Sequence, residues 1–155
     1  MKGSLMKRIV LRYFLSPLFS LYWRVFKPKT FGVKAVIISS EHPKHILMVR
    51  HTYGNTKKWH LPGGGYKPKK EKPDNAVKRE VYEELGMRVE ATKKLGEYKT
   101  SAQGKRDTVD IFLCHASSST YQKNSEISDV QWVKIEEIQE TENYPQITYY
   151  ALSLM

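Results

Sequence analysis

Cysteine is nearly absent from the sequence, and this absence sets the first limits on the protein. Cys114 is the single cysteine among 155 residues, so no disulfide can form within the chain, which favours a reducing compartment such as the cytoplasm. Cys114 lies in the apolar run 109–114, a context typical of a buried strand and not of a nucleophile. Repeats and low-complexity tracts are also lacking, and 40% of the residues are hydrophobic, so we expect one globular domain with its own core.

A long uninterrupted apolar run is lacking as well. Residues 5–26 are rich in large apolar side chains, but Arg12 and Arg24 leave only 11 residues between them. A membrane-spanning helix needs about 20 mostly apolar residues, which argues against a transmembrane segment. No small-residue cleavage site follows within residues 19–29, which argues against a secretory signal.

Acidic residues are missing from the first 40 positions, although the chain has a formal net charge of +10. Eight of the 26 Lys and Arg residues fall in this part: Lys2, Lys7, Arg8, Arg12, Arg24, Lys27, Lys29 and Lys34. The remainder has 18 basic and 16 acidic residues and is close to neutral. Nucleic acid is therefore not expected as a partner, because the basic charge belongs to the N-terminal part and not to the whole surface.

Residues 5–26 are predicted to form an amphipathic helix. On a helical wheel the apolar side is made by Val10, Leu11, Phe14, Leu15, Pro17, Leu18, Leu21, Tyr22 and Val25. The opposite side is made by Arg8, Arg12, Ser16, Ser20 and Arg24. Pro17 is expected to kink or divide this helix, because proline removes an interior hydrogen bond.

Three interpretations fit this N-terminal segment. It packs on its own domain, it covers a homodimer interface, or it lies peripherally in a membrane surface with its basic side chains toward anionic headgroups. The pair Tyr22-Trp23 and the basic flanks favour membrane contact, which for a cytoplasmic protein means the inner face. Lys27 to Thr30 has the composition of a boundary, so we expect a segment 1–29 followed by a catalytic domain 30–155.

The strongest chemical signal is a group of three carboxylates on one helical turn. Glu80, Glu83 and Glu84 stand at i, i+3 and i+4, which places their side chains on a common helix face. Like charges at these spacings repel by roughly 0.2–0.5 kcal/mol per pair, so the arrangement favours a bound cation. Oxygen ligands without Cys or His nearby suit Mg²⁺ or Mn²⁺ better than Zn²⁺. The five histidines are scattered without ligand spacing, and no role is assigned to them.

The stretch from Gly65 to Met87 resembles the Nudix box, G-x5-E-x7-R-E-U-x-E-E-x-G-U, in which U is aliphatic. Every specified position is filled when Met87 counts as aliphatic, and average residue usage gives odds on the order of 10⁻⁸ for a chance match. Residues 59–65 resemble the strand and glycine-rich turn that enter this motif, although three glycines and Lys70 depart from the usual loop. The resemblance implies a Mg²⁺- or Mn²⁺-dependent pyrophosphohydrolase that attacks a diphosphate linked to another group with water.

The resemblance also implies a role for each motif residue. The metal ligands would be Glu80, Glu83, Glu84 and the carbonyl of Gly64. Glu84 could also position the attacking water. Arg79 keeps its proton at any ordinary pH, so it would orient Glu71 or Glu83. Glu71 would support the metal ligands and would not act as the base toward the attacking water.

The general base and the substrate are less closely defined by the motif. Glu126, six residues before Trp132, falls where some family members have a catalytic or metal-binding glutamate, and Asp129 is its rival. Arg50 and Lys58 are candidates for binding phosphate. Lysines that crowd the loop before the motif would attract an anionic substrate.

Nucleoside di- or triphosphates are the expected substrates, because the sequence lacks the markers of hydrolases for ADP-ribose, diadenosine polyphosphates and coenzyme A. Two alternatives stay open. One is a nucleotide- or diphosphate-binding sensor module without turnover, which the three intact glutamates argue against. The other is removal of pyrophosphate from RNA 5′ ends, which the near-neutral domain argues against.

Local patterns predict an α/β fold, an α/β/α sandwich with a mixed β-sheet, as the resemblance implies. The main helix is expected over 73–85, with Pro73 in its first turn and Gly86 after its end. Val77, Val81 and Leu85 would face the core while the glutamates face out. Strands are expected over 31–39, 45–51, 58–61, 88–100, 108–116 and 130–133, and further helices over 135–140 and about 144–154.

Overall fold

The computed structural model describes residues 28–53, 56–101 and 106–155. The expected amphipathic helix over residues 5–26 lies outside the described residues. Within the described ranges, no helix is both long enough and apolar enough to cross a membrane.

The chain divides into two units. The smaller unit consists of residues 1–30 and 99–108, and in its described part the Arg106 N–H donates to the Pro28 carbonyl at 3.0 Å. The larger unit consists of residues 31–98 and 109–155 and contains all the candidate site residues.

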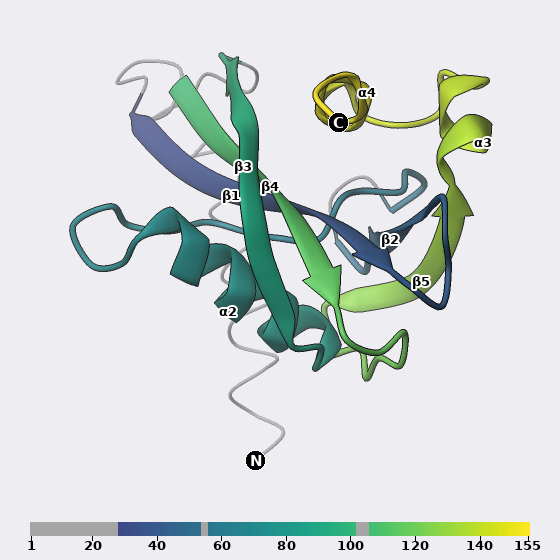
Figure 1. Ribbon diagram of the computed structural model, residues 1–155. Coiled ribbons are helices and arrows are strands. Elements are labelled where there is room, and N and C mark those ends of the chain that lie inside the picture. The colour runs from purple at the N-terminus through teal and green to yellow at the C-terminus, as the bar shows by residue number, and fades with distance from the viewer. Residues whose placement is uncertain (1–27, 54–55, 102–105) are drawn as a thin grey trace. The chain divides into compact units, whose positions relative to one another are not determined.

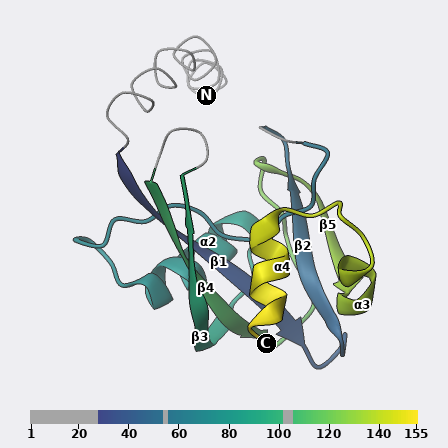
Figure 2. The same cartoon turned by 90° about the horizontal axis from the view of Figure 1, so that it is seen from above.

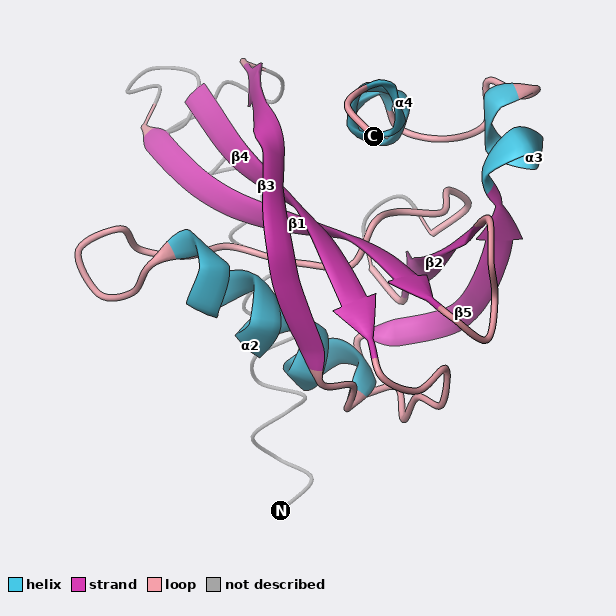
Figure 3. Ribbon diagram, in the orientation of Figure 1, coloured by secondary structure: helices cyan, strands magenta, loops and turns pink. Residues whose placement is uncertain are grey.

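Five strands and three helices are described, and Figures 1 and 3 show their arrangement. In chain order they are β1 (Lys29–Ser39), β2 (His45–His51), α2 (Pro73–Leu85), β3 (Val89–Thr100), β4 (Arg106–Ala116), β5 (Ile127–Lys134), α3 (Ile135–Gln139) and α4 (Gln146–Ser153). Each element begins within two residues of its predicted start, except β5, which begins three residues earlier than expected.

The strands form two sheets joined by an irregular segment. One sheet has the order β1-β4-β3, and the other pairs β2 with β5 in antiparallel register. Residues 59–66 connect them: His60 bridges to Val49 of β2, and Val33 N–H of β1 then donates to the Gly64 carbonyl at 2.9 Å. The strand expected over residues 58–61 is therefore wrong. The chain leaves β2 after one bridge, and Pro62 has no N–H with which to extend a ladder.

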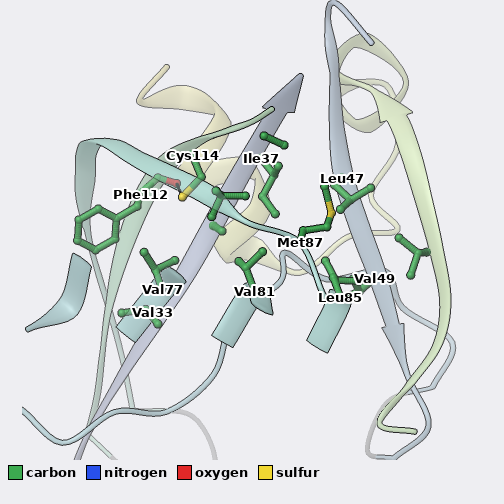
Figure 4. Packing of buried hydrophobic residues seen from close by; sticks show 14 of the residues in the cluster. Val33, Ile37, Leu47, Val49, Val77, Val81, Leu85, Met87, Phe112 and Cys114 are labelled. Carbon is green, nitrogen blue, oxygen red and sulfur yellow. Dashed lines mark hydrogen bonds between the residues drawn. The ribbon is translucent and has the colours of Figure 1, made fainter. Parts of the chain in front are cut away.

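Alternating side chains of the strands supply two cores. Val33 and Ile37 of β1 pack against α2, together with Leu47, Phe112 and other buried residues (Figure 4). Val36, one position out of phase, packs in a second cluster that contains residues of α3 and α4. Figures 1 and 2 agree that α2 and α4 lie on opposite sides of the sheet β1-β4-β3. This arrangement confirms the expected α/β/α sandwich.

Helix α2 begins and ends where its sequence predicts. Pro73 occupies the first turn, where a missing N–H is tolerated, and Asp74 adds negative charge near the N-terminus. Gly86 ends the helix in the left-handed region with φ 63°, and its N–H donates to the Tyr82 carbonyl at 2.8 Å. Val81, on the buried side, is fully inaccessible and fixes the helix against the sheet.

Candidate active site

The glycine-rich segment is pressed between strand β1 and helix α2. Gly63 has φ 125°, and a Cβ there would lie 2.3 Å from the Val33 carbonyl oxygen, which no side chain can approach so closely. A Cβ on Gly64 would lie 2.4 Å from the Glu80 Oε2. Glycine at both positions therefore lets the backbone reach the carboxylates of the helix.

Glu84 is buried and bonded to this segment. Its relative exposure is 6%, and its Oε2 accepts a hydrogen bond from the Gly63 N–H at 3.0 Å. Burial raises the pKa of Glu84 to about 7, and nearby Lys34 and the Gly63 bond oppose that rise. The prediction that the glutamates face out is therefore wrong for Glu84, because the glycine turn covers this end of the helix face.

Lys34 completes the surroundings of Glu84, and the sequence reading missed it. Its Nζ donates to the carbonyls of Leu61 and Gly63, both at 2.8 Å. Burial lowers the pKa of Lys34, whereas Glu84 and Glu80 act in the opposite direction. A lone lysine inside the apolar strand over 31–39 was the signal that could have revealed it.

Arg79 gathers the other motif carboxylates at the surface. Its Nη2 lies 2.7 Å from Glu71 Oε1, and its Nη1 lies 2.8 Å from Glu80 Oε1 and 3.2 Å from Glu83 Oε2. Its Nε also donates to Glu71 at 3.2 Å, so the guanidinium binds that carboxylate through two nitrogens. These hydrogen bonds hold the pKa of Glu71 below its usual value.

Glu80 stands between the two environments. Its side chain is 14% exposed, its carboxylate lies against Gly64, and it also pairs with Arg79. Burial raises the pKa of Glu80, and the hydrogen bond from Arg79 opposes that shift. The helix therefore brings Glu80 and Glu84 to the glycine turn, while Glu83 stays at the surface with Arg79.

The donor types at this junction fit a hard divalent cation. The carboxylates of α2 and the backbone oxygens of the glycine turn are the ligands that Mg²⁺ and Mn²⁺ prefer. In the described part of the chain no three His, Cys, Asp or Glu side chains are grouped so that they could hold a metal ion. Arg79 engages Glu80 and Glu83, while Glu84 accepts from Gly63. Convergence would require Glu80 and Glu83 to turn away from Arg79.

Glu126 lies near the buried end of this group, whereas the contact of Asp129 is within β5. The charge of Glu126 contributes to the raised pKa of Glu84, and the Tyr53 hydroxyl lies 3.5 Å from Glu126 Oε2. Asp129 instead accepts a hydrogen bond from the N–H of Val130, its own neighbour in β5, at 3.0 Å. Position therefore favours Glu126 of the two candidate bases.

The two candidate phosphate-binding residues are not brought to the glutamates. The Arg50 guanidinium lies over the Trp59 ring at 4.4 Å from its centroid. Lys58 is half-buried and makes none of the hydrogen bonds or ion pairs described above for the glutamates. Both assignments remain predictions.

A pair of histidines lies near this region, although no ligand spacing in the chain had pointed to a role for them. The rings of His51 and His60 are 5.5 Å apart, and His51 is 5.3 Å from the ring of Tyr53. Burial lowers the pKa of His51 to about 4, helped by the charge of Lys34, so this imidazole is neutral at pH 7. Only the folding of β2 against residues 59–61 brings these side chains together.

This geometry can be set against known proteins. A family model described as the NUDIX domain matches residues 28–152. The chain belongs to the Nudix hydrolase family. Nudix hydrolases act on diphosphate bonds and generally use divalent metal ions, which agrees with the carboxylate helix and glycine turn.

Curated relatives and solved structures support the same membership. A MutT-like protein from Streptomyces ambofaciens is 35% identical over 95 residues, 61% of this chain, and the match spans only 58% of that protein. Diphosphoinositol polyphosphate phosphohydrolase 3-alpha from Mus musculus is 30% identical over 120 residues, which are 74% of this chain and 71% of that protein. The crystal structure of a MutT protein from Methanosarcina mazei Go1 is 25% identical with a TM-score of 0.69, covering 83% of this chain and 91% of that chain.

Proposed function

We propose that this Nudix domain hydrolyses a nucleoside diphosphate linked to another group, with nucleoside di- and triphosphates as the first substrates to test. The observation that carries the proposal is that Glu80 and Glu84 of α2 lie against the glycine turn, with Glu83 linked to Glu80 through Arg79. Carboxylates that repel one another have no evident use in a protein that only binds a nucleotide, which argues against a sensor module.

Each residue has a role in the proposed reaction. Glu80, Glu83, Glu84 and the Gly64 carbonyl would hold Mg²⁺ or Mn²⁺, which when bound neutralises the diphosphate and activates water. Glu126 would accept a proton from the attacking water, with Glu84 as the second candidate for positioning that water. Arg79 orients Glu71 and, in the absence of metal, compensates the negative charges of Glu80 and Glu83. Arg50 and Lys58 stay candidates for contacts to the rest of the substrate.

A second substrate class is favoured by a specific observation. Lys67, Lys69, Lys70 and Lys72 are exposed on the loop between Gly65 and α2. One curated relative is named a diphosphoinositol polyphosphate phosphohydrolase. Four ammonium groups beside the site would favour a substrate with phosphates beyond the scissile diphosphate.

A hydrolysis panel with Mg²⁺ tests the proposal. It compares nucleoside triphosphates, nucleotide sugars, dinucleoside polyphosphates, a diphosphoinositol polyphosphate and triphosphorylated RNA, with phosphate release as the readout. Activity that needs the metal and prefers nucleotides supports the first class. A preference for the inositol compound that disappears when the four lysines are changed to serine supports the second class, and no metal-dependent turnover of any compound contradicts both.

For residues 5–26 we propose peripheral membrane contact as one of three open interpretations, beside packing on the domain and a homodimer interface. The basic and apolar sides of the segment support this inference. The full-length protein should sediment with anionic liposomes and be only partly released by high salt, because apolar burial is insensitive to screening. A chain starting at Thr30 should stay unbound, folded and active. Absence of liposome binding together with unfolding of that shorter chain would assign the segment to the domain core.

A further inference from the structure

The end of helix α2 is completed by a loop from far along the chain. A helix leaves its last four carbonyls without partners inside the helix. In α2 the first of these is bound by the N–H of Gly86, and the other three are bound by residues 122–124. The three bonds run from Asn124 Nδ2 to the Glu83 carbonyl at 2.8 Å, from Asn124 N–H to the Glu84 carbonyl at 2.9 Å and from Gln122 N–H to the Leu85 carbonyl at 2.7 Å.

The same asparagine also holds the residue that the proposed reaction uses as a base. Asn124 Oδ1 accepts a hydrogen bond from the Glu126 N–H at 2.8 Å. On its other side, the Glu126 carbonyl accepts from the Thr52 N–H at 2.9 Å, at the end of β2. The backbone of Glu126 is thus fixed between the end of α2 and the end of β2.

We propose that Asn124 is a positioning residue that sets Glu126 in register with Glu83 and Glu84. Its amide group binds the peptide carbonyl of one motif glutamate and the N–H of Glu126 at the same time. Its backbone binds the carbonyl of the other glutamate. A shift of the loop 122–126 therefore changes the distance between Glu126 and the carboxylates of α2. This inference rests on the proposed role of Glu126.

A set of four enzymes measures whether Asn124 acts through Glu126: the unchanged protein, Asn124→Ala, Glu126→Gln and the double variant. Asn124→Ala should lower kcat about tenfold with KM nearly unchanged, because a small misplacement of a reacting group is enough. Glu126→Gln should lower kcat roughly 10²-fold, the usual scale for general base catalysis. The double variant should be no slower than Glu126→Gln, and full multiplication of the two effects overturns the proposal.

Two further variants separate positioning from simple capping of the helix. Asn124→Asp keeps an acceptor for the Glu126 N–H but loses the donor toward Glu83 and adds negative charge at a helix C-terminus, which is unfavourable. It should therefore keep more activity than Asn124→Ala while being no more stable. If activity instead follows stability across these variants, Asn124 is only a cap. Ser128→Ala is the matched control, since it removes a bond from the nearby strand to the Arg50 carbonyl at 3.0 Å and should leave kcat unchanged.

A measurement without turnover distinguishes failure of this inference from failure of the proposed function. Hydrogen exchange of the Glu126 amide should become faster in Asn124→Ala and stay slow in Ser128→Ala. Unchanged exchange in Asn124→Ala overturns the proposal even if the enzyme is active. If Glu126→Gln keeps full activity, the base assignment fails and the positioning role fails with it. A slow Glu126→Gln enzyme with an independent Asn124→Ala effect leaves the proposed function intact and rejects this inference alone.

Discussion

The glutamates of the motif lie in two regions that differ in how negative charge is compensated. In the arginine cluster, Glu71 and Glu83 pair with Arg79, and their side chains are 25% and 55% exposed. In the Glu84 site, the carboxylate is 6% exposed and its compensation comes from a backbone N–H and the charge of Lys34. Glu80 belongs to the arginine cluster through its ion pair and touches the Glu84 site through Gly64.

The difference shows that neighbouring residues of one motif can have opposite energetic roles. Exposed ion pairs contribute about 0–1 kcal/mol each, so the arginine cluster has little effect on folding. A buried carboxylate loses hydration, so its charged form destabilises the fold until a cation binds it. We therefore expect metal to couple to stability through Glu84 and to catalysis through both regions.

The largest expected effect is a loss of catalysis, and it should be similar for a glutamate of the arginine cluster and for Glu84. Glu83→Gln and Glu84→Gln should each lower kcat by roughly 10²-fold or more, the scale for losing a major electrostatic element of an active site. The measurement is steady-state hydrolysis at saturating Mg²⁺, with circular dichroism to confirm folding. Glu90→Gln is the matched control, because its exposed carboxylate pairs with Lys78 outside the site. Near-full activity in a folded Glu83→Gln protein would remove Glu83 from the metal ligands.

Gly63 and Gly64 are adjacent, but alanine at each position should affect stability to a different extent. Gly63→Ala should destabilise by about 2–4 kcal/mol, because its Cβ meets the Val33 carbonyl at a φ that L residues avoid. Gly64→Ala should cost less than about 1 kcal/mol, because its Cβ meets only the movable end of Glu80, yet it should weaken activation by Mg²⁺. Urea unfolding and a Mg²⁺ titration of activity measure the two effects. Equal destabilisation by both changes would show that Glu80 is as rigid as the backbone.

The sequence predicted most of the fold because local patterns determine it. Pro73, the four-residue spacing of buried valines and Gly86 define α2 within the chain itself, and short apolar runs define β1 and β2. The burial of Glu84 could not be predicted in this way, because helical phase says which residues share a face and not what covers that face. The covering groups come from Gly63 and Lys34, which are distant in sequence. The contacts of Asn124 with Glu83 and Glu84 are likewise set by tertiary packing alone.

A pH dependence of stability should separate the two regions in the absence of metal. The pKa of Glu84 is raised to about 7 in the folded state from 4.5, so folding favours its protonated form. The contribution of protonated Glu84 to the free energy of unfolding is fully present below pH 4.5 and is lost as the pH rises through about 7. At pH 8 without metal, Glu84→Gln should therefore be more stable than the unchanged protein by roughly 1–3 kcal/mol, and this difference should vanish near pH 4.

The control for this prediction is Glu83→Gln, from the arginine cluster. Its stability should differ from that of the unchanged protein by less than about 1 kcal/mol at both pH values, as for other exposed pairs. Adding Mg²⁺ at pH 8 should stabilise the unchanged protein and not Glu84→Gln, because the cation binds the ionised carboxylate. A Glu84→Gln protein that is less stable than the unchanged chain at pH 8 without metal would contradict the assignment of an unfavourable buried charge.

The smallest expected effect concerns Arg79 and tests whether the arginine cluster is dispensable for folding. Arg79 binds Glu71 through two nitrogens and binds Glu80 and Glu83 through its third nitrogen. Lysine has a single nitrogen, so Arg79→Lys keeps the positive charge but loses most of these hydrogen bonds. Because the Arg79 side chain is 36% exposed, the melting temperature should fall by no more than about 4 °C, and by less in 1 M NaCl because salt screens exposed pairs. Lys78→Arg, a neighbouring exposed cation change, should have no measurable effect. A fall above about 10 °C that persists in high salt would place the arginine cluster, like the Glu84 site, among the parts that determine stability.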